Sequence, residues 1–171
     1  MHLERKCLIL VAMFTAAGAF AQQQPAQRPF KPQILPWPDT TVTYASAADV
    51  ANLIATAKKE RKDDAPLVVG RVLQLAPYTV VLEYRETTTK LADAGIHPKD
   101  DELVYVLDGS GTLVTGGKVA ADHMSIEGGE SKQLGKGDFV LIPAGTPHWI
   151  NHVDQTMELI IVHMPQPATA Q

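Results

Sequence analysis

Residues 137–151 read GDFVLIPAGTPHWIN, and residues 95–109 read GIHPKDDELVYVLDG. Each stretch places one histidine, His148 or His97, next to turn-forming glycine and proline and beside a short apolar run. Apolar runs bounded by such turns predict β-strands. Imidazoles and a carboxylate that come together from separate strands are typical of a metal site. The two stretches therefore indicate the fold and nominate a site.

The chain after Pro66 has the pattern of strands and turns throughout. We expect strands at residues 67–75, 78–86, 102–107, 112–115, 131–134, 139–142, 148–153 and 157–164. The run Asp108-Gly109-Ser110-Gly111 is interpreted as a hairpin turn between two of them. Many short strands with glycine and proline between them indicate an all-β barrel or sandwich.

One helix is predicted ahead of the strands, within residues 45–64. Ser46 is a good N-cap, and an apolar stripe at helical spacing follows it, made of Val50, Leu53, Ile54 and Ala57. Residues 63–66 are expected to end the helix. The basic residues between 58 and 62 are interpreted as a solvated helix end, where positive charge suits the helix dipole.

Residues 1–21 have the pattern of a signal peptide. Arg5 and Lys6 precede an apolar segment that is too short to favour a membrane anchor, and Ala19-Phe20-Ala21 has small residues where signal peptidase reads them. Removal of this segment would take away Cys7, the only cysteine. We therefore expect an exported protein, periplasmic or secreted, that is stabilised without disulfides.

Residues 22–44 form a segment rich in proline and glutamine, which favours an extended backbone. Two interpretations stay open: a flexible tether, or an arm that lies across the domain or a neighbouring subunit with Trp37 as its anchor. The tail, residues 166–171, is expected to fray. With 171 residues and a net charge of −4, the chain suits one domain and lacks the basic patch of a nucleic-acid or membrane-surface binder.

Together the two stretches resemble the two signature motifs of the cupin family, whose members are small double-sheet jelly rolls. The residues that match the second motif position for position are Gly137, Pro143, Gly145 and His148. Asn151 follows one residue earlier than is usual in the family. The residues that match the first motif are His97, Glu102 and Gly109. The resemblance spans residues 67–164 and implies a cupin-type double-stranded β-helix, or jelly-roll barrel, at residues 65–165.

The first motif is incomplete, because the family's His-x-His pair reads Gly95-Ile96-His97 here. Glycine offers no ligand atom, so the resemblance implies three metal ligands: His97, Glu102 and His148. Two imidazoles and one carboxylate leave several metal positions open. We expect one divalent transition metal, with Fe favoured and Cu, Mn, Zn or Ni as alternatives.

The strand pattern also favours a buried Glu102. Its side chain shares a strand face with Val104 and Val106 and would point into an apolar interior, where a lone carboxylate is costly unless it is paired or bound to metal. The alternative to metal is a buried ion pair of Glu102 with Lys99 or His148.

Three other histidines need an interpretation. His152 shares the face of His148 if the strand is regular, so His152 is one alternative for the missing ligand, and His163 on the last strand is another. For both, a hydrogen-bonded histidine at the rim is favoured over a ligand. His123 lies in a polar loop and is expected to be exposed. Trp149 is interpreted as a wall residue.

These features favour a metal-dependent enzyme of the oxidoreductase or oxygenase type that acts on a small organic or sugar-derived substrate. The alternatives are a non-catalytic or metal-free ligand-binding cupin, a metal-dependent lyase or isomerase, and a copper-dependent oxidative carbohydrate enzyme. We expect no nucleic-acid partner and no membrane partner after signal cleavage. The resemblance implies a homodimer.

Overall fold

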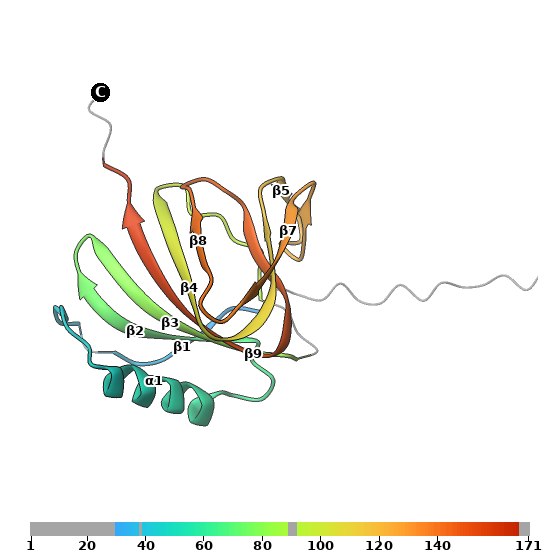
Figure 1. Ribbon diagram of the computed structural model, residues 1–171. Helices are drawn as coiled ribbons and strands as arrows, with labels where there is room; N and C mark the ends of the chain where they lie inside the picture. Colours follow the sequence, from blue (N-terminus) through green and yellow to red (C-terminus); the bar gives the residue numbers. More distant parts are fainter. Residues whose placement is uncertain (1–29, 38, 89–91, 168–171) are drawn as a thin grey trace, which may run out of the picture.

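The computed structural model describes residues 30–37, 39–88 and 92–167. It shows a large curled β-sheet with a helix on its outer face, and a separate two-stranded sheet (Figure 1). The predicted fold class, all-β with one N-terminal helix, is confirmed. The predicted signal peptide lies outside the described residues. In chain order the elements are β1 (Gln33–Ile34), α1 (Ala47–Glu60), β2 (Leu67–Leu75), β3 (Tyr78–Glu86), β4 (Asp100–Thr115), β5 (Lys118–Val119), β6 (Ile126–Glu127), β7 (Glu130–Gly135), β8 (Phe139–Ile142) and β9 (His148–Pro165).

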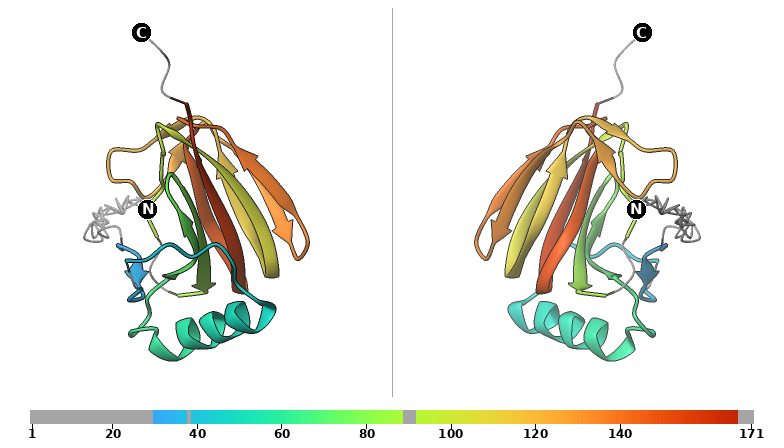
Figure 2. Two further views of the ribbon diagram at one scale, coloured as in Figure 1. Left: turned by 90° about the vertical axis from the view of Figure 1, so that its left-hand side faces the viewer. Right: turned by 90° about the vertical axis from the view of Figure 1, so that its right-hand side faces the viewer.

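The main sheet has the strand order β1-β2-β3-β9-β4-β7, and β8 pairs with β4 as well. Its longest part is an antiparallel ribbon of β4 and β9, whose pairs run from Asp100 with Pro165 to Thr115 with His148. The ribbon bends strongly along its length (Figures 1 and 2). The bend carries β7 and β8 around an apolar interior in which Val81 of β3, Leu134 of β7 and Ile142 of β8 belong to one buried cluster. The interior therefore has sheet on opposite sides.

Residues 108–111 do not form the hairpin turn that we predicted. They lie inside β4, where the pairing with β9 shifts register at three places and the strand bends, as β-bulges cause. Gly109 has a φ of +81°, and a Cβ there would lie 2.0 Å from the carbonyl oxygen of Thr156 on β9. The glycine thus permits a positive φ and a close strand approach instead of a chain reversal. The partner strand is likewise continuous: residues 148–153 and 157–164, which we predicted as two strands, both belong to β9.

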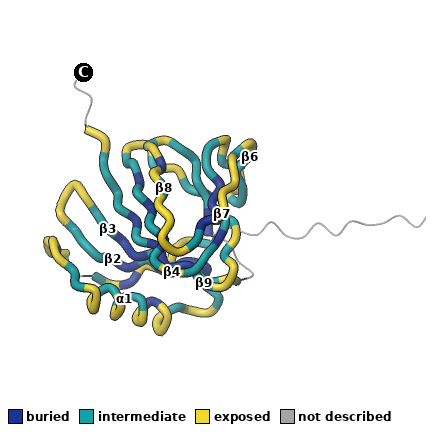
Figure 3. The backbone as a smooth tube through the Cα atoms, in the orientation of Figure 1, coloured by how far each residue is buried: buried dark blue, intermediate teal, exposed yellow. Residues whose placement is uncertain are grey.

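Strands β2 and β3 have the bounds that the sequence predicted, and they are buried on both faces. One face of β3 contributes Val81 to the interior cluster. The other face packs under α1, where the buried residues are Leu35, Ala57, Val68, Leu82 and Tyr84. Figure 3 shows the buried segments along the strands and the exposed outer side of the helix. Burial on both faces explains why these strands read as nearly continuous apolar runs.

Helix α1 begins at Ala47 with Ser46 as its N-cap, as predicted, and Ser46 and Asp49 form a reciprocal capping box. It ends at Glu60, earlier than predicted, because Arg61 adopts an extended conformation. The basic end is not simply solvated: Lys58 Nζ lies 2.9 Å from Oε1 of the buried Glu158, and Arg61 pairs with Glu86. These ion pairs add to the apolar contacts that fix the helix on the sheet.

The described part of the proline-rich segment lies against the sheet. β1 pairs in parallel with β2, and Leu35 is buried beneath the helix layer. The guanidinium carbon of Arg71 lies 4.2 Å from the centroid of the Trp37 ring, a cation–π contact. Over these described residues the segment lies along the sheet of its own domain, with Trp37 against Arg71. Within the described ranges, no helix is long and apolar enough to cross a membrane.

Candidate metal centre

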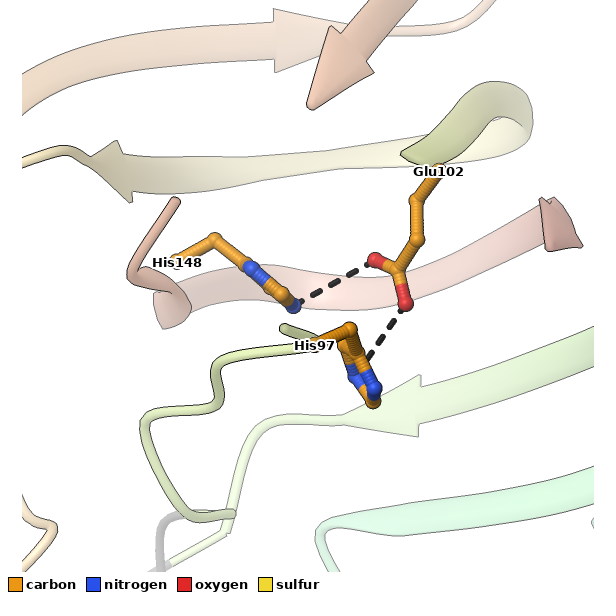
Figure 4. A group of neighbouring side chains, drawn as sticks. All are labelled: His97, Glu102 and His148. Carbon is orange, nitrogen blue, oxygen red and sulfur yellow. Dashed lines mark ion pairs between the residues drawn. The ribbon is translucent and has the colours of Figure 1, made fainter. Parts of the chain in front are cut away.

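His97, Glu102 and His148 come together at one edge of the interior (Figure 4). His97 lies in the segment between β3 and β4, Glu102 near the start of β4, and His148 at the first position of β9. Each residue offers one ligand atom, and these atoms all lie within 4.8 Å of one another. The structure thus brings the three predicted site residues together in one group.

Backbone hydrogen bonds hold the two histidine-bearing stretches together. Gly95 and His148 form an isolated β-bridge, with N···O distances of 2.9 and 3.0 Å in its two hydrogen bonds. The N–H of Gly145, two residues after Pro143, donates to the carbonyl of His97 at 2.8 Å. The turn-forming residues that marked the sequence therefore fix the backbone on which His97 and His148 stand.

The carboxylate of Glu102 accepts contacts from three imidazoles. Its side chain is only 6% exposed. Oε1 lies 3.1 Å from Nε2 of His97 and 3.2 Å from Nδ1 of His163, and Oε2 lies 3.3 Å from Nε2 of His148. The exposed Lys99 is replaced in this role by the histidines. Glu102 is buried with Val104 and Val106, as predicted. It also pairs with His148, one of the two partners that we expected for an ion pair without metal.

The pKa values of this group follow from these contacts. Burial alone would raise the pKa of the Glu102 carboxyl, but the hydrogen bond from His163 and the positive charge of the three imidazoles outweigh it, so the pKa is lowered. The pKa of His163 is raised, chiefly by its hydrogen bond to Glu102. These contacts therefore favour the ionised carboxylate of Glu102.

A hydrogen bond to the backbone fixes the orientation of the His148 ring. Its Nδ1 lies 3.0 Å from the carbonyl oxygen of Thr146, and because a carbonyl only accepts, Nδ1 carries the proton. In a neutral ring Nε2 then has a lone pair, and that lone pair faces Oε2 of Glu102 at 3.3 Å. Two acceptors in contact repel each other unless a proton or a metal ion lies between them. A backbone carbonyl that fixes the tautomer in this way is typical of metal-binding histidines.

The spacing of the donor atoms fits a metal ion. Two ligand atoms that each lie about 2.1 Å from one ion are roughly 3.0–3.4 Å apart. The three nitrogen–oxygen separations around Glu102, between 3.1 and 3.3 Å, fall in this range. Imidazole nitrogen and carboxylate oxygen suit Fe, Zn, Ni, Cu or Mn. The residues present thus fit one divalent transition metal, and their chemistry does not select among these.

Of the other histidines, His163 belongs to the cluster and His152 does not. His163 lies directly opposite Glu102 in the β4–β9 register. His152 is exposed and pairs with Asp154, because a register shift between Ile150 and His152 turns it off the face of His148. His123 is exposed, as expected. The sequence offered only the strand face of His163 as a signal, since its partner lies far away along the chain.

Gly95 stands where the first motif lacks a histidine. A Cβ at this position would lie 3.5 Å from Nε2 of His148 and 3.9 Å from Nε2 of His97, so a side chain there would point at the cluster. The gap in the motif is therefore also a gap beside the candidate centre.

A cavity of about 280 Å³ lies against the cluster. Its wall is mostly apolar and includes Val69, Val81, Leu113, Ile161 and Trp149. The indole N–H of Trp149 donates to the carbonyl of Ala92 at 2.8 Å, which fixes the ring as part of the wall. The cavity therefore suits a small organic molecule.

Comparisons with known proteins agree with this fold. The cupin-domain family model matches residues 86–163. The acireductone dioxygenase of Leptospira biflexa serovar Patoc is 38% identical over 60 residues, which are 35% of this chain and 29% of that protein. The chain thus spans less than a third of the length of the curated relative that it matches.

Two solved structures share the fold. A conserved protein of unknown function from Streptococcus pyogenes has a TM-score of 0.51 and 13% identity, over 75% of this chain and 95% of that one. The DMSP lyase DddQ from Ruegeria pomeroyi has a TM-score of 0.51 and 16% identity, over 77% of this chain and 70% of that one. At these identities the likeness concerns the fold alone. The family match shows that residues 86–163 form a cupin domain, and the curled sheet around them agrees with it.

Proposed function

We propose that this protein is a metal-dependent cupin enzyme of the oxidoreductase type that acts on a small organic substrate in the cavity beside Glu102. The observation that carries the proposal is that His97, the buried Glu102 and His148 bring three ligand atoms within 4.8 Å of one another. The stretch that is 38% identical to an acireductone dioxygenase supports the choice of an oxygenase over other chemistries.

His97, Glu102 and His148 would hold the metal, with Fe(II) favoured because two imidazoles and one carboxylate leave positions open. A bound iron would supply coordination positions for substrate and dioxygen, together with redox chemistry. Residues of the chain would orient the ligands and shape the substrate site. The Thr146 carbonyl keeps the His148 ring in one tautomer and orientation. The apolar wall excludes water from the reacting end of the substrate and sets its size.

Metal content and oxygen uptake test the proposal. The purified full chain, reconstituted with Fe(II) without oxygen, is expected to retain about one metal ion per chain by elemental analysis. His97→Ala and His148→Ala should lose it, while His152→Ala, a change at an exposed histidine, should retain it. A panel of small organic acids, enediols and sugars would then be screened for oxygen consumption.

The outcomes separate the alternatives. A chain that takes up no stoichiometric metal would refute the proposal in favour of a metal-free ligand-binding cupin. Metal-dependent substrate loss without oxygen uptake would refute the oxygenase part and point to a lyase or isomerase. Copper-dependent activity on a carbohydrate would refute the choice of iron and favour a copper-dependent oxidative carbohydrate enzyme.

We also propose that the protein is exported and forms a homodimer. Support for export is the signal-like pattern of residues 1–21, and the test is N-terminal sequencing of protein recovered from outside the cytoplasm. Light scattering with and without residues 22–44 tests the dimer. A monomer in both forms would remove the dimer and any role of the arm in it.

A further inference from the structure

We propose that His163 is a fourth protein ligand of the metal, bound through Nδ1, beside His97, Glu102 and His148. The inference rests on the proposed function, because it concerns the same centre. It adds a residue that lies outside both histidine-bearing motifs.

Register places His163 in the centre. Glu102 of β4 and His163 of β9 are direct partners across an antiparallel pair, so their side chains lie on the same face of the sheet. That face is the interior one, since Val104 and Ile161, two residues along from each partner, are both buried in the interior cluster. The imidazole therefore enters the cluster from the strand next to Glu102.

One distance places its nitrogen beside the carboxylate of Glu102. Nδ1 of His163 lies 3.2 Å from Oε1 of Glu102, the same oxygen that lies 3.1 Å from Nε2 of His97. The rings of His97 and His163 meet edge to face, with centroids 5.6 Å apart. Because ligand atoms of one metal ion are roughly 3.0–3.4 Å apart, Nδ1 of His163 is spaced from Glu102 as a ligand would be.

Gly95 supplies no donor, so the first motif leaves the centre one imidazole short. A side chain at residue 95 would approach His148 and His97 from the segment before β4, and glycine leaves that approach without a donor. His163 reaches the carboxylate of Glu102 from the directly facing position on β9. The centre then has three imidazoles and one carboxylate, although the first motif supplies only one histidine.

A purely structural role would be for His163 to hold Glu102 by a hydrogen bond. The variant His163→Asn separates the two roles, because the Asn amide nitrogen replaces Nδ1 as a hydrogen-bond donor but has no lone pair for a metal ion. Affinity alone does not separate them, since loss of a hydrogen bond to a ligand already weakens metal binding by roughly 10–100-fold. The identity of the metal-bound ring nitrogens separates the two roles.

The experiment is NMR of the full chain with ¹⁵N-labelled imidazoles, loaded with one equivalent of Zn²⁺. We expect three metal-bound ring nitrogens, two of them Nε2 and one Nδ1. His163→Asn and His163→Ala should both lose the Nδ1 signal and bind Zn²⁺ at least about 100-fold more weakly. His152→Ala, on the same strand but outside the cluster, should keep all three signals.

Two bound nitrogens in the wild-type chain, or a His163→Asn variant with wild-type affinity and spectrum, would overturn the inference while leaving the proposed function intact. Failure of the wild-type chain to take up metal would overturn both. If neither variant folds, the nitrogen count of the wild-type chain decides alone: three with one Nδ1 supports the inference, and two rejects it.

Discussion

Substitution of Gly95 by histidine should tighten metal binding, because the change puts a donor into the gap of the first motif. The backbone of Gly95 has no positive φ, and the added Cβ would meet its neighbours at 3.5–3.9 Å, which is ordinary van der Waals contact. The added Cβ therefore needs no movement of His97 or His148. The β-bridge between residues 95 and 148 uses backbone atoms only and would persist.

The size of the gain follows from the worth of one ligand. Zinc sites with four protein ligands bind with roughly 10–16 kcal/mol, or about 2.5–4 kcal/mol per ligand. If half to all of the lower value is realised at Gly95→His, the gain is roughly 1.3–2.5 kcal/mol. At about 1.4 kcal/mol per tenfold, we expect a Zn²⁺ affinity some ten to sixty times higher.

Chelator competition with Zn²⁺ measures this gain. Gly95→Ala is the matched control, because it adds the Cβ without a donor and should leave affinity near that of the wild-type chain. Thermal unfolding without metal should show both variants folded. A folded Gly95→His chain with unchanged affinity would refute the claim that residue 95 faces the metal.

Three further changes test the fold and the electrostatics. Gly109→Ala should cost more than about 3 kcal/mol of unfolding free energy or prevent folding, because it combines a positive φ with a Cβ 2.0 Å from a backbone oxygen; urea unfolding measures it. Leu82→Ala should cost about 2–5 kcal/mol by the same assay, because this side chain is 0% exposed between helix and sheet. The metal-free chain should lose thermal stability as the pH rises above about 6.5, because a raised pKa of His163 stabilises the fold only while its ring is protonated. Below about 4.5 the lowered pKa of Glu102 should likewise reduce stability, since the unfolded carboxyl then binds protons that the folded one resists.

Matched variants control these three predictions. Gly116→Ala has a similar φ of +78° but open space around the Cβ, so it should cost only about 1–2 kcal/mol, and equal losses at the two glycines would contradict the packing argument. Leu75→Ala, at a side chain that is 52% exposed, should change stability by less than about 0.5 kcal/mol. In His163→Asn the loss of stability above pH 6.5 should shrink; an undiminished loss would assign the titration to another group.

Local sequence patterns were enough to predict the bounds of β2 and β3 and three residues of the candidate centre. The bounds of β2 and β3 follow from apolar runs between Pro66 and Pro77 and beyond, which any register would preserve. His97, Glu102 and His148 stand in or beside turns whose glycine and proline are visible in the sequence.

Features that depend on pairing between distant strands were not visible. The run around Gly109 has the composition of a hairpin turn, and only the approach of β9 shows that it is a bend within one strand. The register shift that turns His152 outward is likewise set by its partner strand. His163 enters the cluster because β9 pairs with β4 at Glu102, and no local pattern records that pairing.

The curl of the β4–β9 ribbon has a mechanical consequence. The partners of His148 and Glu102 along the ribbon are Thr115 and His163, at its two ends, yet the side chains of His148 and Glu102 meet. A metal ion held between them would act as a clasp across roughly fifty residues of chain. By the loop-closure argument used for cross-links, such a clasp is worth on the order of 4 kcal/mol. In a chain whose one cysteine is Cys7, that clasp would do the work of a disulfide, and amide exchange across the ribbon should slow when metal binds.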